Sequence, residues 1–207
     1  MTRDAQTIQD DIAYMRALAH EGRHAPLLAG PVLVTAAVVF GAANLGQWAI
    51  QSGLLRVDPW AQLWLWIGAG VVFGVVLTVL IGRMKGKPGY NSSGNTAVGA
   101  AWSGVGYGIF VTWLALITLS VKTDNWVWMT VMPTIVLVAY GSAWMVAAAM
   151  TRARWMSITA LASYAGAVAV AWFSDSPAIY LVFTGVLAAV ALVPGLILMR
   201  QEPSEVV

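Results

Sequence analysis

The sequence predicts an all-α membrane protein with six transmembrane helices, arranged as three antiparallel hairpins. Composition is the first reason: 59% of the 207 residues are hydrophobic and only 10% are charged, whereas soluble domains carry about 25% charged residues. The second reason is that six windows contain no Asp, Glu, Lys or Arg. These windows are residues 25–55, 59–82, 88–121, 125–151, 155–174 and 176–199. Each can hold the helix of roughly 20 residues that spans a bilayer and satisfies its own backbone hydrogen bonds.

The six helices follow in chain order within these windows. We place them near residues 27–50, 60–83, 97–120, 126–150, 155–173 and 178–200. Because the connections after the first, third and fifth helices are short, consecutive helices should pack as antiparallel pairs. Before the first span, residues 1–24 carry Ile8, Ile12 and Met15 at helical spacing, which predicts a cytoplasmic amphipathic helix. After the last span, residues 201–207 form a cytoplasmic tail.

The positively charged residues predict the orientation. Nine of the eleven Lys and Arg residues fall on one side of the spans: Arg3, Arg16, Arg23, Arg83, Lys85, Lys87, Arg152, Arg154 and Arg200. Only Arg56 and Lys122 fall on the other side. By the positive-inside rule both termini are cytoplasmic, and we expect a multi-pass protein of the bacterial inner membrane. Five of the cytoplasmic cations are also placed to contact anionic lipid headgroups: Arg83, Lys85, Lys87, Arg152 and Arg154.

The predicted spans hold no charged residue in their centres. This argues against a proton relay, a voltage sensor or an ion-coupled antiporter, because those functions use ionisable groups within the membrane. The chain also has no cysteine, which excludes disulfides and thiolate metal sites. Side chains that could line a polar intramembrane site are Asn44, Gln47, Tyr107, Thr112, Tyr140 and Ser163. Asn44 and Gln47 form the best pair, and we expect them to bond between helices rather than hold a ligand.

Small residues recur at four-residue spacing in three of the spans. The pairs are Gly70 with Gly74, Gly104 with Gly108, and Ala162 with Gly166. Such pairs let two helix backbones approach closely, so we expect them to mark helix-packing faces. The sequence does not distinguish packing within one chain from packing between two copies. The glycines of the third span also fit an alternative in which that helix is broken around a cavity.

One stretch before the first span has the H-E-x-x-H pattern of zinc metalloproteases, with His20, Glu21 and His24 in the three named positions. A zinc site needs a third protein ligand, but these are the only two histidines, and on this side of the membrane the downstream carboxylates are Glu202 and Glu205. A glycine inside the motif and a proline just after it also disfavour a continuous helix. We therefore interpret the match as coincidence, and we expect no metal and no other cofactor.

Three functions remain open, in order of preference. The first is a non-catalytic accessory, sensor-like or interaction protein, acting through helix packing and a cytoplasmic docking face formed by residues 1–24 and 84–97. Its partners would be the lipid bilayer, a cytoplasmic protein and, in one arrangement, a second copy of the chain; we expect no nucleic acid. The second is a small transporter or channel for a neutral or lipophilic solute. The third is a zinc-dependent hydrolase with Glu21 as the general base.

Overall fold

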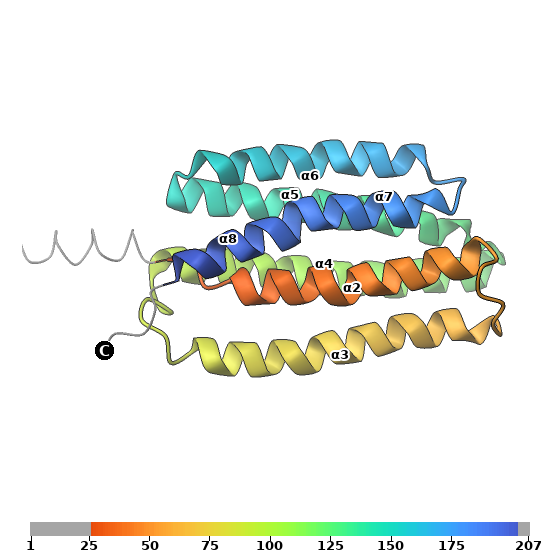
Figure 1. Cartoon of the computed structure of the whole chain (residues 1–207), viewed down its shortest axis with the longest axis horizontal. Helices are drawn as coiled ribbons and strands as arrows, with labels where there is room; N and C mark the ends of the chain where they lie inside the picture. The colour runs from red at the N-terminus through yellow and green to blue at the C-terminus, as the bar shows by residue number, and fades with distance from the viewer. Residues whose placement is uncertain (1–25, 203–207) are drawn as a thin grey trace, which may run out of the picture.

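The computed structural model describes residues 26–202, which form a bundle of long helices running side by side (Figure 1). The elements are α2 (Gly30–Gln51), α3 (Trp60–Met84), α4 (Ser93–Thr123), η1 (Trp126–Val131), α5 (Met132–Thr151), α6 (Arg154–Trp172), α7 (Ala178–Leu187), η2 (Ala188–Leu192) and α8 (Val193–Gln201). η1 continues into α5, and α7, η2 and α8 form one C-terminal span. Within residues 26–202, six segments are therefore long and apolar enough to cross a membrane. This confirms a helical membrane protein with six candidate spans. The predicted helix in residues 1–24 and the tail residues 203–207 lie outside the described residues.

The third span begins earlier than its sequence predicts. α4 starts at Ser93, four residues before the predicted start. Ser92 has an extended backbone, and its hydroxyl accepts a hydrogen bond of 3.2 Å from the backbone N–H of Asn95. This N-cap satisfies a donor that the first helical turn leaves free. The polar residues 93–97, whose composition predicted a loop, are therefore helical, and the connection to α3 is only residues 85–92.

The core of the bundle is formed by α2, α5, α6 and the C-terminal span. α5 and α6 share the most extensive helix–helix interface. Arg152, with a left-handed φ of 57°, lets the chain reverse within a two-residue connection. Buried alanines bring the two backbones close: Ala143, Ala147, Ala148, Ala160 and Ala167. The core also joins helices from different predicted hairpins, because α2 packs against α7, η2 and α8.

α3 and α4 lie at the periphery of the bundle. α3 packs mainly against α2, and α4 packs mainly against α5 and η1. No residue of α3 is buried by residues 26–202, and α4 contributes only Val98 and Ser120 to the buried set. Figure 1 places α3 at the edge of the bundle opposite α6. Most of the surface of these two helices is therefore free to contact lipid or another protein.

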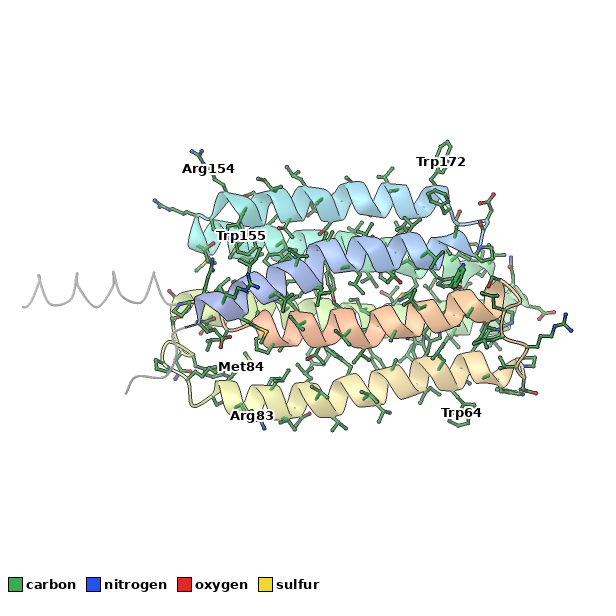
Figure 2. All side chains as sticks on the ribbon, in the orientation of Figure 1. Trp64, Arg83, Met84, Arg154, Trp155 and Trp172 are labelled. Carbon is green, nitrogen blue, oxygen red and sulfur yellow. The ribbon has the colours of Figure 1, made fainter. Side chains whose placement is uncertain are left out.

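The two ends of the bundle carry different side chains. Figure 2 shows Arg83 and Arg154 at one end, and Trp64 and Trp172 toward the other. Trp172 is 84% exposed. Exposed indoles of this kind are common at membrane–water interfaces, where the ring contacts lipid and the N–H stays near water. The long axis of the bundle is thus the direction expected to cross the bilayer.

Candidate functional site

Two of the six residues predicted to line a polar site, Asn44 and Gln47, lie on one buried face of α2. Gln47 is 3% exposed, and its Nε2 donates a hydrogen bond of 2.7 Å to Oε1 of Gln62 on α3. Its Oε1 accepts a hydrogen bond of 3.2 Å from the indole Nε1 of Trp66, also on α3. Gln51 donates to the same Gln62 oxygen at 3.0 Å. Gln47 therefore uses both ends of its amide to hold α3 against α2.

Asn44 lies about one helical turn from Gln47, deeper in the span, and is 1% exposed. Its Nδ2 donates a hydrogen bond of 2.7 Å to the carbonyl of Phe40 in the same helix. Its Oδ1 has no hydrogen-bond partner among residues 26–202. A buried acceptor without a donor destabilises a fold by about 1–3 kcal/mol. Asn44 thus keeps an unused acceptor inside the bundle.

The other four predicted residues are dispersed. Ser163 on α6 is fully buried, and its hydroxyl donates to the carbonyl four residues earlier at 2.9 Å. Tyr140 on α5 packs edge-on against Trp102 of α4, with ring centroids 5.0 Å apart. On α4, Thr112 is partly buried, and Tyr107 is 74% exposed. No hydrogen bond within residues 26–202 links these four to each other or to the α2 amides, so the six side chains do not form one hydrogen-bonded site.

A cluster of aromatic residues occupies the half of the core nearer to Arg154. Trp144 of α5 is at its centre, fully buried. Its ring centroid lies 5.6 Å from Trp102 and 5.8 Å from Trp155, and Figure 2 shows Trp155 turned toward the bundle. Edge-on and tilted ring pairs of this kind add to the stability that burial provides. Sequence reasoning missed this cluster; the available signal was a tryptophan in the middle of a span rather than at an interface.

Trp144 also completes the hydrogen bonding of the C-terminal span. Pro194 has no N–H, so the carbonyl four residues earlier, that of Val190, loses its α-helical donor. The helix is π-helical here, and the N–H of Val193 bonds to the carbonyl of Ala188. Trp144 Nε1 donates a buried hydrogen bond of 2.9 Å to the Val190 carbonyl. A side chain of α5 thus replaces the backbone donor that proline removes, as a helix in lipid requires.

The predicted small-residue pairs divide between the core and the periphery. A Cβ atom at Gly166 would lie 2.4 Å from Val186 Cγ1, so this glycine allows α6 to contact α7, whereas Ala162 is exposed. Apart from chain neighbours and the backbone of the same helix, no atom of residues 26–202 lies within 4 Å of a Cβ built at any of four other glycines: Gly70, Gly74, Gly104 and Gly108. These four do not pack against the described part of the chain. Packing between two copies stays a prediction for them.

A close contact between α2 and α8 involves two glycines that lie outside the predicted small-residue pairs. A Cβ at Gly30 would lie 2.9 Å from the carbonyl oxygen of Gly195, and a Cβ at Gly195 would lie 3.0 Å from the carbonyl oxygen of Gly30. α2 and α8 therefore touch backbone to backbone. Gly30 has no small residue at four-residue spacing, because Pro26 and Val34 occupy those positions. Ala191, in contrast, lies four residues before Gly195 and forms a small-residue pair that sequence reasoning did not use.

Tyr107 differs from the other hydroxyl residues on the exposed face of α4. Ser103 and Thr118 each donate to the carbonyl four residues earlier at 2.8 Å. The Tyr107 hydroxyl makes no hydrogen bond within residues 26–202. The residue lies near the middle of α4, about 20 Å from either helix end at 1.5 Å per residue. It is therefore too far from the membrane surface to place its hydroxyl there, as long side chains near helix ends do.

The end of the bundle that carries Arg83 is held together by Asn95, close to the start of α4. Asn95 Oδ1 accepts a hydrogen bond of 3.0 Å from the N–H of Leu28. Its Nδ2 donates to the carbonyls of Pro26 at 2.9 Å and Gly89 at 3.0 Å. One amide thus ties the segment before α2 to the loop between α3 and α4.

The five cations predicted to contact anionic lipid belong to this same end. Four are exposed: Arg83, Lys85, Arg152 and Arg154. Lys87 instead forms an ion pair with Glu202 at the end of the C-terminal span. The motif residues His20, Glu21 and His24 lie outside the described residues. Within residues 26–202, no group of three His, Asp or Glu side chains is placed to hold a metal ion.

Comparison with known proteins adds no relative. No protein-family model, no curated protein and no solved structure matches the chain. Function must therefore be argued from the geometry alone. Inside the bundle, side chains such as Gln47 and Trp144 form hydrogen bonds between helices, and aromatic rings pack against each other. The largest uncovered surfaces belong to α3 and α4. Such an arrangement is suited to close contacts with further helices.

Proposed function

We propose that the chain is a non-catalytic integral membrane protein that acts by binding other proteins. It does so laterally through α3 and α4, and at its cytoplasmic end through residues 1–24 and 84–97. The uncovered surface of α3 and α4 carries this proposal. Val71 on α3 and Val111 on α4 are 60% and 61% exposed. Glycines at four-residue spacing on both helices leave the backbone open to another helix, and this is the pattern by which membrane helices associate.

We further propose that the protein lies in the bacterial inner membrane with both termini in the cytoplasm, and that its spans are inserted as three hairpins. The described cations support this orientation by the positive-inside rule. Those at one end are Arg83, Lys85, Lys87, Arg152, Arg154 and Arg200, whereas Arg56 and Lys122 are at the other. The exposed cations at the cytoplasmic end also favour contact with anionic headgroups.

Single cysteines test the orientation, because the chain has none of its own. Gly86→Cys lies in the connection between α3 and α4, and Leu54→Cys lies in the connection between α2 and α3. A membrane-impermeant maleimide added to spheroplasts should label Leu54→Cys at once, and Gly86→Cys only after permeabilisation. The reverse pattern would mean that the bundle is inserted the other way.

Lipid accessibility tests the proposed interaction. Nitroxide labels are placed at Val71→Cys on α3 and Val111→Cys on α4, with Val168→Cys on α6 as the control because Val168 is 74% exposed. The protein is purified in polymer nanodiscs that retain its native membrane neighbours. A partner on α3 or α4 should lower the accessibility of that label to molecular oxygen, measured by EPR power saturation, below that of the control. Equal accessibility at all three positions would contradict the proposal.

One observation favours the second candidate, a transporter for a neutral or lipophilic solute. The unpaired Oδ1 of Asn44 is an acceptor within a span, and such an atom can bind a hydroxyl-bearing solute. Uptake of glycerol into proteoliposomes, followed by light scattering, tests this function. Transport predicts faster uptake than in empty vesicles and loss of that uptake in Asn44→Leu. Uptake at the rate of empty vesicles would count against it for this solute class.

A further inference from the structure

The exposed face of α4 combines two features that point to one partner. Gly104 and Gly108 lie one turn apart on the same side as Tyr107 and Val111, and their surroundings are open within residues 26–202. The Tyr107 hydroxyl lies at mid-span without a hydrogen bond in the described part of the chain, and an unpaired hydroxyl in lipid is unfavourable. α3 is also uncovered but has no comparable group, because its exposed Thr78 donates to the carbonyl four residues earlier at 2.8 Å.

We propose that this face of α4 is the contact surface of a homodimer, in which Tyr107 of each copy hydrogen-bonds to Tyr107 of the other. The inference rests on the proposed function and names the partner of α4. A phenol hydroxyl can donate or accept a hydrogen bond, so the hydroxyl of one Tyr107 can donate to that of the other. Every copy has the same orientation in the membrane. A two-fold axis along the membrane normal therefore places both Tyr107 side chains at the same depth.

The charges and the shape of the surface suit a second copy of the chain. The first charged side chain on α4 is Lys122, in the last turn, so two copies meet across the bilayer without like charges facing each other. Gly104 and Gly108 allow two α4 backbones to approach closely at the level of Tyr107. A different protein would have to carry a hydrogen-bonding side chain at the bilayer centre, whereas a second copy carries one there by symmetry.

Disulfide cross-linking between copies tests the dimer directly. Val111→Cys lies on the proposed surface, and Val168→Cys on α6 is the control, the same substitution at a residue that is 74% exposed against 61% for Val111. Each variant is purified, reconstituted at high lipid dilution into vesicles of phosphatidylethanolamine and phosphatidylglycerol, and oxidised with copper phenanthroline. Val111→Cys should cross-link roughly tenfold or more faster, because residues held near one another have a high effective concentration. Equal rates for the two variants would overturn the proposal.

Two further variants test the geometry of the contact. Tyr107→Phe keeps the ring and removes the hydroxyl. It should weaken the association constant, measured by energy transfer between labelled copies, about threefold, which is the typical strength of an interhelical hydrogen bond in a membrane. Gly108→Leu should weaken association roughly tenfold or more by keeping the backbones apart, and Val168→Leu should leave it unchanged. An unchanged constant in Tyr107→Phe would rule out the Tyr107 pair.

The cross-linking and the oxygen-accessibility measurements separate this inference from the proposed function. If residue 111 is shielded in nanodiscs with native neighbours but does not cross-link in vesicles of the pure protein, the homodimer is wrong and another protein covers α4. If residues 71 and 111 are both open to oxygen and no cross-link forms, the homodimer and the proposed lateral interaction are both wrong. Shielding of residue 111 from oxygen together with a cross-link supports both the homodimer and the proposed lateral interaction.

Discussion

α5 and α4 are neighbours of similar apolar composition, yet their surroundings differ. Eight residues of α5 are buried, including Trp144, whereas the much longer α4 has two. α5 is enclosed by α4, α6 and the aromatic cluster, and it supplies the C-terminal span with a hydrogen bond. α4 leaves Tyr107 and two glycines uncovered. Apolar character therefore decides whether a helix enters the bilayer, but it does not decide what the helix then touches.

The reason is physical. Lipid tails and protein side chains are similarly apolar, so no hydrophobic force draws one membrane helix to another. Packing, small residues and hydrogen bonds determine which faces are covered. Matched substitutions in the core and at the periphery can therefore be compared. They test whether the two regions differ in their contribution to stability as much as their burial indicates.

The largest difference is expected between two tryptophans. Trp144→Ala removes a fully buried ring and the donor to the Val190 carbonyl, and it should lower the free energy of unfolding by on the order of 3–5 kcal/mol. Trp64→Ala, at a residue that is 65% exposed, should change it by less than about 0.5 kcal/mol. Unfolding in mixed micelles with increasing dodecyl sulfate measures both. Similar losses would show that α3 is as well packed as α5.

A second comparison uses glycines. Gly166→Leu forces a side chain into Val186, where a Cβ already approaches to 2.4 Å, and it should destabilise the monomer by about 1–3 kcal/mol. Gly108→Leu meets open space and should alter monomer stability by less than about 0.5 kcal/mol, while reducing dimer formation. Thermal unfolding of the protein as a detergent-solubilised monomer separates the two effects. A large loss of stability in Gly108→Leu would mean that α4 is covered within the monomer.

A third experiment tests the hydrogen bond that joins α5 to the C-terminal span. Trp144→Phe keeps an aromatic ring but leaves the Val190 carbonyl unpaired, at a cost of about 1–3 kcal/mol. Pro194→Ala restores a backbone N–H that can serve the same carbonyl. In the Pro194→Ala background, Trp144→Phe should therefore cost less than it does alone, as a double-mutant cycle measures. Additive effects would show that the indole and the proline are not linked.

The smallest effect is expected at the end of the bundle that carries Arg83. Lys87→Met removes the ion pair with Glu202, and because Lys87 is partly exposed the loss of stability should be below about 1 kcal/mol. The loss should shrink further in molar salt, which screens exposed charges. Lys85→Met, at an exposed lysine nearby, is the control and should have no effect. A salt-independent loss at Lys87 would indicate a role for its side chain other than charge pairing.

The spans were predictable because two simple properties determine them. A run of about 20 residues without charge is long enough to cross the bilayer. One such run begins at Pro59, directly before α3, and another begins directly after Arg154, the first residue of α6. The start of α4 was missed because Ser92 and Asn95 are typical of loops by composition, while their side chains in fact cap a helix. Composition alone does not separate these two uses of the same residues.

The contents of the core could not be predicted from one sequence. Gly166 and Gly108 look alike as motifs, and only the neighbouring helix distinguishes a packed glycine from an open one. Gln47 was identified as a polar residue in a span, but its partners, Gln62 and Trp66, follow only when α3 is known to lie beside it. The pairing of Trp144 with Val190 likewise depends on two spans that are separated in the sequence and adjacent in space.

The Val190 carbonyl has a consequence for how the protein is made. The C-terminal span follows α5 in the chain, and Pro194 removes the N–H that would bond to its Val190 carbonyl in an α-helix. The indole of Trp144, on the earlier span, donates to this carbonyl. The hydrogen bonding of this span at Pro194 is therefore completed when the span packs against α5, and not by insertion into the bilayer alone.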